Sequence, residues 1–180
     1  MAEYKSFQEG IKVNGEAILG LITALPTGQD IRRQILKKHG IDPVPGKLYS
    51  QQAWLDAFKE IAGIIGNHTV FIIAKTIAEN AKWPSIDNIK TALTLFDQAY
   101  KMNNTGGDVG DYKLLKFDEM NKTAVMYCRT PYPSEFDRGL LTAIVRKFRP
   151  KNSYKTEVTL DVTKESRTKG ADSCTFNIAW

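Results

Sequence analysis

The hydrophobic period of this sequence changes about half-way along the chain. Up to about residue 102, apolar side chains recur every three or four residues, which is typical of helices. From about residue 110 onward, several short segments alternate between apolar and polar residues, which is typical of strands with one buried face. The alternation is strict in 157–163 and in 174–180. This pattern predicts a helical first half and an antiparallel sheet in the second half.

Six segments of the chain have helical spacing. Gly66 ends the third of them, and Ser50 is placed to cap its start. Either Ser85 or Asp87 is placed to cap the fifth. In the last, Ser134 is placed as the cap, and Asp137 favours the positive end of the helix. The segments cover 16–25, 29–39, 51–66, 69–82, a helix after residue 85 or 87 that reaches residue 100, and 134–148.

The strands of the second half are expected to form two hairpins. Segments 112–117 and 123–129 are joined by a polar turn, and 157–163 and 174–180 are joined by residues 164–173. We therefore predict an α+β fold in which the helical half packs on a four-stranded antiparallel sheet, with a further helix between the hairpins. The whole of 1–180 is expected to form a single domain, with the helical part at about 1–102 and the sheet part at about 110–180.

Composition excludes several classes of protein. Hydrophobic residues make up 42% of the 180 residues and charged residues 25%, as in ordinary globular domains, so disorder, collagen and coiled coil do not fit. The net charge of +5 comes from 25 basic and 20 acidic residues, and it does not require a nucleic-acid partner. The basic residues around Pro150 are expected to form a solvated helix end. Contact with an anionic partner is the alternative for them.

Cysteine usage and the start of the chain indicate a cytoplasmic protein. Cys128 and Cys174 form no Cys-x-x-Cys pair, which argues against a zinc ribbon or a dithiol redox motif. The first residues lack the apolar segment of a signal peptide. The most apolar stretches, 17–26 and 70–74, are too short to span a bilayer.

No catalytic or metal-binding constellation emerges from the spacing of polar residues. Glu135 and Asp137 are two apart on a helix and do not face each other, so they are no ready acid–base pair. The glycine-rich segment 106–110 lacks the Lys-Ser/Thr of a phosphate-binding loop. We expect no enzyme and no metal site.

Three stretches together resemble the vinyl-4-reductase-like and heme-NO-binding-like (H-NOX-like) superfamily. They are 99–104 with 107–112, then 130–139 with Pro-Tyr-Pro at 131–133, and 169–176 with Gly-Ala-Asp-Ser-Cys at 170–174. This superfamily also includes ligand-sensing domains of aromatic-responsive regulators and a subunit of a vesicle-tethering complex. The resemblance implies a helical first half, a sheet backed by helices, a pocket for a small apolar or aromatic ligand, and frequent dimers.

The chain departs from the superfamily where its members bind metals. Ser134 and Ser166 stand where relatives often carry cysteines, and no histidine occurs in 101–104. We therefore expect no cofactor. A heme would need an axial ligand, and His39 and His68 both have the positions of surface caps, which leaves Tyr100 or Cys128 as alternatives.

The sequence thus favours a cytosolic sensory or signalling module that binds a small hydrophobic or aromatic ligand without catalysis. A homodimeric protein-interaction module without a ligand is the first alternative, and a heme-based gas sensor is the second. A regulatory protein partner is compatible with all three. We expect the ligand to lie in a cavity lined by Tyr100, Tyr112, Phe136, Cys174 and Phe176, because these come from the stretches that carry the resemblance and from apolar faces.

Overall fold

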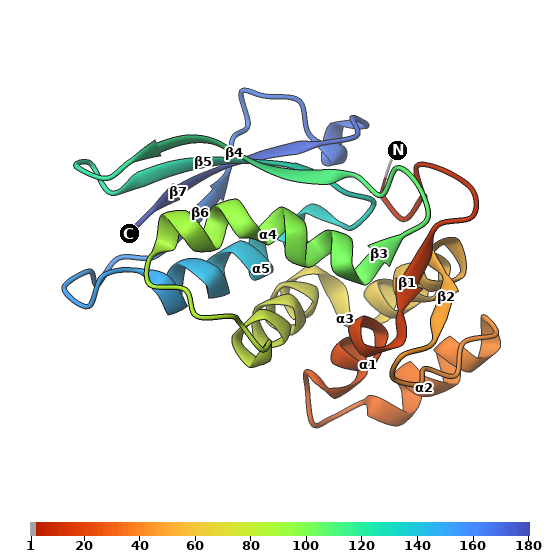
Figure 1. Ribbon diagram of the computed structural model, residues 1–180. Helices are drawn as coiled ribbons and strands as arrows, with labels where there is room; N and C mark the ends of the chain where they lie inside the picture. Colours follow the sequence, from red (N-terminus) through yellow and green to blue (C-terminus); the bar gives the residue numbers. More distant parts are fainter. Residues whose placement is uncertain (1–2) are drawn as a thin grey trace.

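The computed structural model, which describes residues 3–180, contains a four-stranded antiparallel sheet with helices packed on one face (Figure 1). The strand order is β4-β5-β7-β6. Helix α4 (Ile89–Asn103) packs against β4 and helix α5 (Ser134–Phe148) against β6. The predicted α+β fold is confirmed. The strands are β4 (Asp111–Asp118), β5 (Thr123–Arg129), β6 (Glu157–Leu160) and β7 (Cys174–Ala179).

The register of the central strands explains the alternation seen in the sequence. Met126 lies opposite Phe176 and Cys128 opposite Cys174, and all four side chains are buried on the face that the helices cover. Strand β6 is shorter than predicted because Asp161 starts a turn, in which its carboxylate accepts a hydrogen bond from the Thr163 N–H at 3.0 Å.

The N-terminal half contains helices α1 (Gly15–Thr23), α2 (Gln29–Lys38) and α3 (Gln51–Asn80). The Ser50 hydroxyl accepts a hydrogen bond from the Ala53 N–H, which confirms the predicted cap. Helix α3 consists of two helical segments that meet at a kink at Gly66, whose φ of 75° and ψ of 164° are not helical. Only glycine adopts these angles without strain, so the predicted end of the first segment at Gly66 is confirmed.

Two predicted helix caps are wrong. Helix α4 is capped by Asn88, whose side chain accepts from the Thr91 N–H at 2.9 Å, and not by Ser85 or Asp87. Helix α5 follows Pro133 without a side-chain cap. Ser134 instead lies with its hydroxyl 3.0 Å from the Cys174 sulfur, because it faces the interior.

A small sheet within the helical half was missed from the sequence. It has the order β2-β1-β3 and lies beside α1 and α3 (Figure 1). Two or three residues per strand are too few to show an alternating pattern. Its strands are β1 (Lys12–Asn14), β2 (Leu48–Ser50) and β3 (Asn104–Thr105).

Helices α3 and α5 pack closely and join the two halves of the chain. A Cβ atom at Gly139 would lie 2.4 Å from the Phe71 carbonyl oxygen and 2.7 Å from the Ala74 Cβ, so only glycine fits on α5 at this point. The long helix α3 is therefore part of the core of both halves.

Helix α3 is long and apolar enough to cross a membrane by length and composition alone, among the residues that the structure describes. The non-helical geometry of Gly66 interrupts it near its middle, and a membrane span needs about 20 continuous helical residues. Leu55, Phe58 and Ile73 are fully buried in the protein. These observations favour α3 as a core helix, and the cellular location remains a prediction.

Candidate ligand site between the helices and the sheet

Eight aromatic side chains form a continuous group where the helical half meets the sheet. Neighbouring rings have centroids 4.4–6.4 Å apart, within the range in which aromatic rings attract each other. We call this group the aromatic cluster. Its members are Tyr4, Trp54, Phe58, Phe96, Tyr100, Tyr112, Tyr132 and Phe136.

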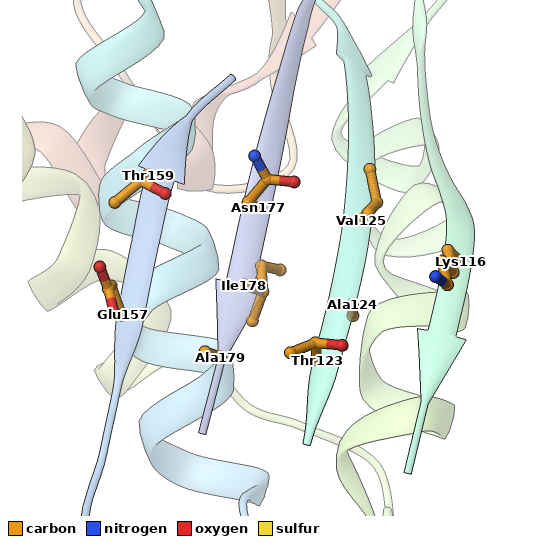
Figure 2. Close-up of a pocket in the computed structure, with 9 residues that line it drawn as sticks. All are labelled: Lys116, Thr123, Ala124, Val125, Glu157, Thr159, Asn177, Ile178 and Ala179. Atoms are coloured by element: carbon orange, nitrogen blue, oxygen red, sulfur yellow. The ribbon is translucent and has the colours of Figure 1, made fainter. Parts of the chain in front are cut away.

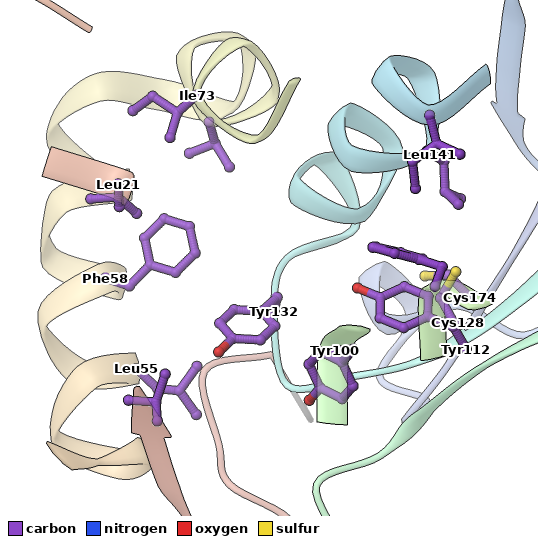
Figure 3. Packing of buried hydrophobic residues seen from close by; sticks show 14 of the residues in the cluster. Leu21, Leu55, Phe58, Ile73, Tyr100, Tyr112, Cys128, Tyr132, Leu141 and Cys174 are labelled. Carbon is purple, nitrogen blue, oxygen red and sulfur yellow. The ribbon is translucent and has the colours of Figure 1, made fainter. Parts of the chain in front are cut away.

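Several of these rings occur in pairs, because residues four apart in the sequence lie on the same face of a helix. Trp54 and Phe58 are four residues apart on α3 and stack at 5.4 Å. Phe96 and Tyr100 are four apart on α4, and both contact Tyr112 of β4, at 4.4 and 5.2 Å. Figure 3 shows Phe58, Tyr132, Tyr100 and Tyr112 following one another from α3 towards β4.

The segment that leads into α5 completes the cluster. Tyr132 and Phe136 contact each other at 5.2 Å, and each also contacts Phe58, at 6.2 and 5.3 Å. Tyr132 therefore links the ring pair of α3 to the start of α5. The Pro-Tyr-Pro segment at 131–133 places this ring in the middle of the cluster.

Three phenol groups of the cluster, those of Tyr100, Tyr112 and Tyr132, are hydrogen-bonded inside the protein. Tyr100 donates to the Val109 carbonyl oxygen at 2.5 Å. Tyr132 donates to the Asn104 side-chain oxygen at 3.2 Å and accepts from the Trp54 indole N–H at 3.3 Å. Burial raises the pKa of Tyr100, Tyr112 and Tyr132 above the ordinary value, so these phenols are neutral at neutral pH.

A buried ion pair lies next to the cluster. The Asp137 carboxylate accepts hydrogen bonds from Tyr112 at 2.5 Å, from Thr130 at 3.0 Å, and from the Arg167 guanidinium. Arg167 also donates to the Cys128 carbonyl oxygen at 2.8 Å. Both charged side chains are 0% exposed. Asp137 lies in the first turn of α5 as predicted, but its side chain points into the interior, which the sequence did not indicate.

The electrostatics of this pair follow from its burial. Burial raises the pKa of Asp137, while Arg167 and the hydroxyls of Tyr112 and Thr130 act in the opposite direction. Burial lowers the pKa of Arg167, but the Asp137 carboxylate together with Cys174, Cys128 and Tyr112 outweighs this effect, so the net shift of the pKa is upward. Each charge therefore depends on its partner to remain in an apolar interior.

The two cysteines lie beside this ion pair. Cys128 and Cys174 are opposite each other on β5 and β7, and both are free and buried. Burial raises the pKa of the Cys128 thiol well above its ordinary value, which disfavours the nucleophilic thiolate. The Cys174 sulfur accepts from the Arg167 backbone N–H at 3.4 Å. These surroundings give the thiols a structural role.

The structure brings together three of the five predicted site residues. Tyr100, Tyr112 and Phe136 all belong to the aromatic cluster. Cys174 and Phe176 lie on the buried face of β7, and no ring contact joins Phe176 to the cluster within residues 3–180. That these five line a ligand site remains a prediction.

Sequence reasoning missed Tyr132, Asp137 and Arg167 as members of one site. The Pro-Tyr-Pro segment was a signal for Tyr132, because prolines on both sides fix the backbone of the residue between them. Asp137 carried a weaker signal, since Leu141 and Ile144 continue the buried face of α5 from its position. Arg167 has no sequence pattern, because a loop residue turns inward only in the folded chain.

Two of the surface hollows in the described residues are not lined by the aromatic cluster. One, of about 390 Å³, lies on the side of the sheet away from α4 and α5, and its lining includes Lys116, Thr159 and Asn177 (Figure 2). The other, of about 420 Å³, is formed by Lys101 and residues 104–111. A ligand that reached the cluster would have to displace side chains that now fill the space.

Several solved structures are similar to this chain in fold. A double-substituted Tt H-NOX domain matches 93% of this chain and 94% of its own, with a TM-score of 0.63 at 14% identity. The H-NOX domain of Shewanella oneidensis in its Fe(II)CO state matches 92% of this chain and 96% of its own, with a TM-score of 0.61 at 14% identity. A third match, from work on heme distortion in the H-NOX family, has a TM-score of 0.61 at 15% identity over 91% and 93%.

The chain has the H-NOX fold. The predicted resemblance to the H-NOX-like superfamily is thereby confirmed at the level of the fold. No protein-family model and no curated protein matches the sequence. The link to vesicle-tethering subunits remains a prediction.

The prediction that no cofactor is involved is contradicted by these neighbours. Two solved structures with this fold are described through heme or porphyrin distortion, and another through its Fe(II)CO state. The sequence argument depended on missing histidines and cysteines. That argument removed histidine as an axial ligand and left Tyr100 or Cys128 as the alternatives, so it did not exclude heme.

The side chains of this chain do not fit a heme in the conformation described. His39 contacts Glu60 at the surface, at 3.0 Å, and the exposed His68 stacks on Phe71, so neither reaches the interior. Tyr100, Tyr112 and Tyr132 use their hydroxyls in internal hydrogen bonds. The aromatic cluster occupies the junction of helices and sheet. Heme would require these rings to separate and one of the buried phenols or thiols to give up its partner.

Proposed function

We propose that this chain is a sensor domain that binds a small ligand at the aromatic cluster, and that heme is the first ligand to test. The observation that supports this most is the agreement in fold with H-NOX domains over 91–93% of the chain. At 14–15% identity the ligand itself does not follow from that agreement. The sensor function and its ligand are therefore tested together below.

The aromatic cluster gives a physical route from ligand binding to a change of shape. Its rings come from α3, α4, β4 and the start of α5, so any ligand inserted among them must move these elements relative to each other. A ligand shifts such an equilibrium only by its difference in affinity for the two arrangements. The bonds that would change first are those of Tyr132 with Trp54 and Asn104.

A smaller apolar or aromatic molecule is the second candidate ligand. The packed cluster favours it, since a single ring can replace a side-chain ring with less rearrangement than a porphyrin needs. It also needs no axial ligand, which suits an interior without histidine among the described residues. Gas sensing would not follow from this candidate.

Titration of the full chain with hemin separates these candidates. Heme binding predicts a shifted Soret band that saturates at about one equivalent. Tyr100→Phe and Tyr132→Phe keep each ring and remove the hydroxyl, so a changed spectrum in one of them identifies the ligating phenol. His68→Ala is the matched control, because His68 is exposed and outside the cluster. A spectrum identical to that of free hemin would contradict heme binding.

Indole and naphthalene are suitable probes for the second candidate. Binding at the cluster predicts a rise in melting temperature and quenching of Trp54, which stacks on Phe58. Native mass spectrometry of freshly purified protein reports any retained ligand and the oligomeric state. A chain that binds neither hemin nor these probes, and that is dimeric, would support the homodimeric interaction module instead.

A further inference from the structure

The connector between β6 and β7 is held to the protein almost without hydrophobic contacts. We call residues 161–173 the strap; it includes a short 3-10 helix, Arg167–Lys169, and is the blue loop beside the sheet in Figure 1. Its most apolar residue, Val162, is 68% exposed. The buried residues of the strap are Ser166, Arg167 and Ser173, all of which are polar. Opening would therefore expose little apolar surface that belongs to the strap itself.

One side chain anchors the strap in the interior. The Arg167 guanidinium donates to Asp137 of α5 and to the Cys128 carbonyl of β5, and both members of the ion pair are fully buried. The Nε of Arg167 is buried without a partner among the described residues. Apolar side chains of similar volume are often as stabilising as a buried ion pair, so the pair is weak evidence of a purely stabilising role.

The anchor is directly connected to the aromatic cluster. Tyr112 donates its hydroxyl to Asp137 at 2.5 Å, on the same carboxylate that holds Arg167. The Tyr112 ring contacts Phe96 and Tyr100 of α4. If Arg167 leaves, water can reach Asp137 and the hydroxyl side of Tyr112.

We propose that the strap opens as a unit when the Arg167–Asp137 ion pair breaks. This opening is the route by which a small ligand reaches the aromatic cluster. The opening follows from the contacts of the strap itself. Its role as a ligand route rests on the function proposed above. The polar anchor makes the closed state specific, while the absence of buried apolar groups keeps opening less costly than unfolding.

Hydrogen exchange of the full chain, followed by mass spectrometry without denaturant, tests the opening. Amides of 161–173 should exchange faster than global unfolding allows, while those of β5 and α3 stay protected. Arg167→Met should accelerate the exchange of the strap by about tenfold to a hundredfold, the loss expected for hydrogen bonds to a charged group. Arg167→Lys keeps the charge and should accelerate the exchange of the strap by less. It replaces Arg167→Met in this test if the Met variant fails to fold.

Arg32→Met is the matched control. Arg32 is the other buried arginine named in the structure, and it binds the carbonyls of Ile22 and Leu25 far from the strap. It should leave exchange in 161–173 unchanged relative to the rest of the chain. Equal exchange of the strap and of β5 in the wild type, or equal acceleration of both by Arg167→Lys, would overturn the proposal.

Tyr112→Phe tests the connection between the Arg167–Asp137 ion pair and the aromatic cluster. It removes one hydrogen bond to Asp137 and keeps the ring, and it should accelerate exchange of the strap by less than Arg167→Met does. If Tyr112→Phe left the exchange rate of the strap amides unchanged, the coupling between the ion pair and the aromatic cluster would be refuted. If the opening of the strap is the ligand route, Arg167→Lys should increase the rate at which hemin or indole binds. Binding with an unchanged rate would refute the route and leave the sensor function intact, whereas a mobile strap without any binding would refute the sensor function alone.

Discussion

Asp108 fastens the glycine-rich loop to the end of the sheet. Its carboxylate accepts hydrogen bonds from the Arg129 guanidinium at 2.9 and 2.6 Å and from the Gly110 N–H at 3.1 Å. Arg129 also lies over the ring of Phe7, 4.3 Å from its centroid. The hydrogen bonds from Arg129, followed by the one from Gly110, hold the pKa of Asp108 below its ordinary value.

This lowered pKa predicts a local dependence on pH. A carboxyl group with a lowered pKa in the folded state stabilises the fold above its unfolded pKa of about 3.9, and this contribution is lost as the pH falls through the folded value. Asp108 should therefore titrate below pH 4 in carbon-detected NMR. In Asp108→Asn the loop signals should no longer change in this range. A midpoint at or above that of a free aspartate would contradict the assignment.

At the scale of elements, the contact between α3 and α5 depends on the absence of a side chain at Gly139. Gly139→Ala should destabilise the fold by about 1–3 kcal/mol, the usual cost of overpacking, because the new Cβ would overlap the Phe71 carbonyl and Ala74. Urea denaturation measures the loss. Gly20→Ala in α1 is the control, since its Cβ would lie 3.7 Å from Ile77, an ordinary contact. Equal stability of the two variants would show that α3 and α5 can separate without cost.

The kink of α3 gives a second prediction for an element. Gly66→Ala should lower the free energy of unfolding by about 1–3 kcal/mol, because its φ of 75° with ψ of 164° is accessible only to glycine. Gly63→Ala, three residues earlier and with open space around its Cβ, should raise stability by about 0.5–1 kcal/mol. Thermal denaturation followed by circular dichroism compares them. If Gly66→Ala were as stable as Gly63→Ala, the helix would be able to run straight through this position.

At the scale of the whole molecule, we expect the helical and sheet parts to unfold together. The aromatic cluster and the contact between α3 and α5 cross the boundary between them, so neither part retains its core alone. Variants that keep only Trp54 or only Trp180 report the two parts by fluorescence. Coincident urea transitions are the expected result, and two separate transitions would show two domains. Homodimer formation and a regulatory partner also remain predictions.

The sequence by itself determined the class of the fold and the approximate place of its larger elements. Periodicity reports which face of a segment is buried, so α3, α5 and the strands from β4 to β7 could be read from it. It did not predict β1, β2 and β3, which are too short to show a period. It placed Asp137 in the first turn of α5 but did not show that the side chain is buried, because an acidic residue in a first turn has the same pattern whether it faces water or the core.

Only the tertiary structure decided which side chains share a site. Tyr112, Asp137 and Arg167 are far apart in the sequence, on β4, α5 and a loop, and they meet because the sheet, the helix and the strap pack around one point. The cofactor prediction failed for a related reason, since it depended on ligand residues at a few positions while the shared H-NOX fold extends over nearly the whole chain. Local patterns record how each segment meets water, and a site arises from contacts between segments.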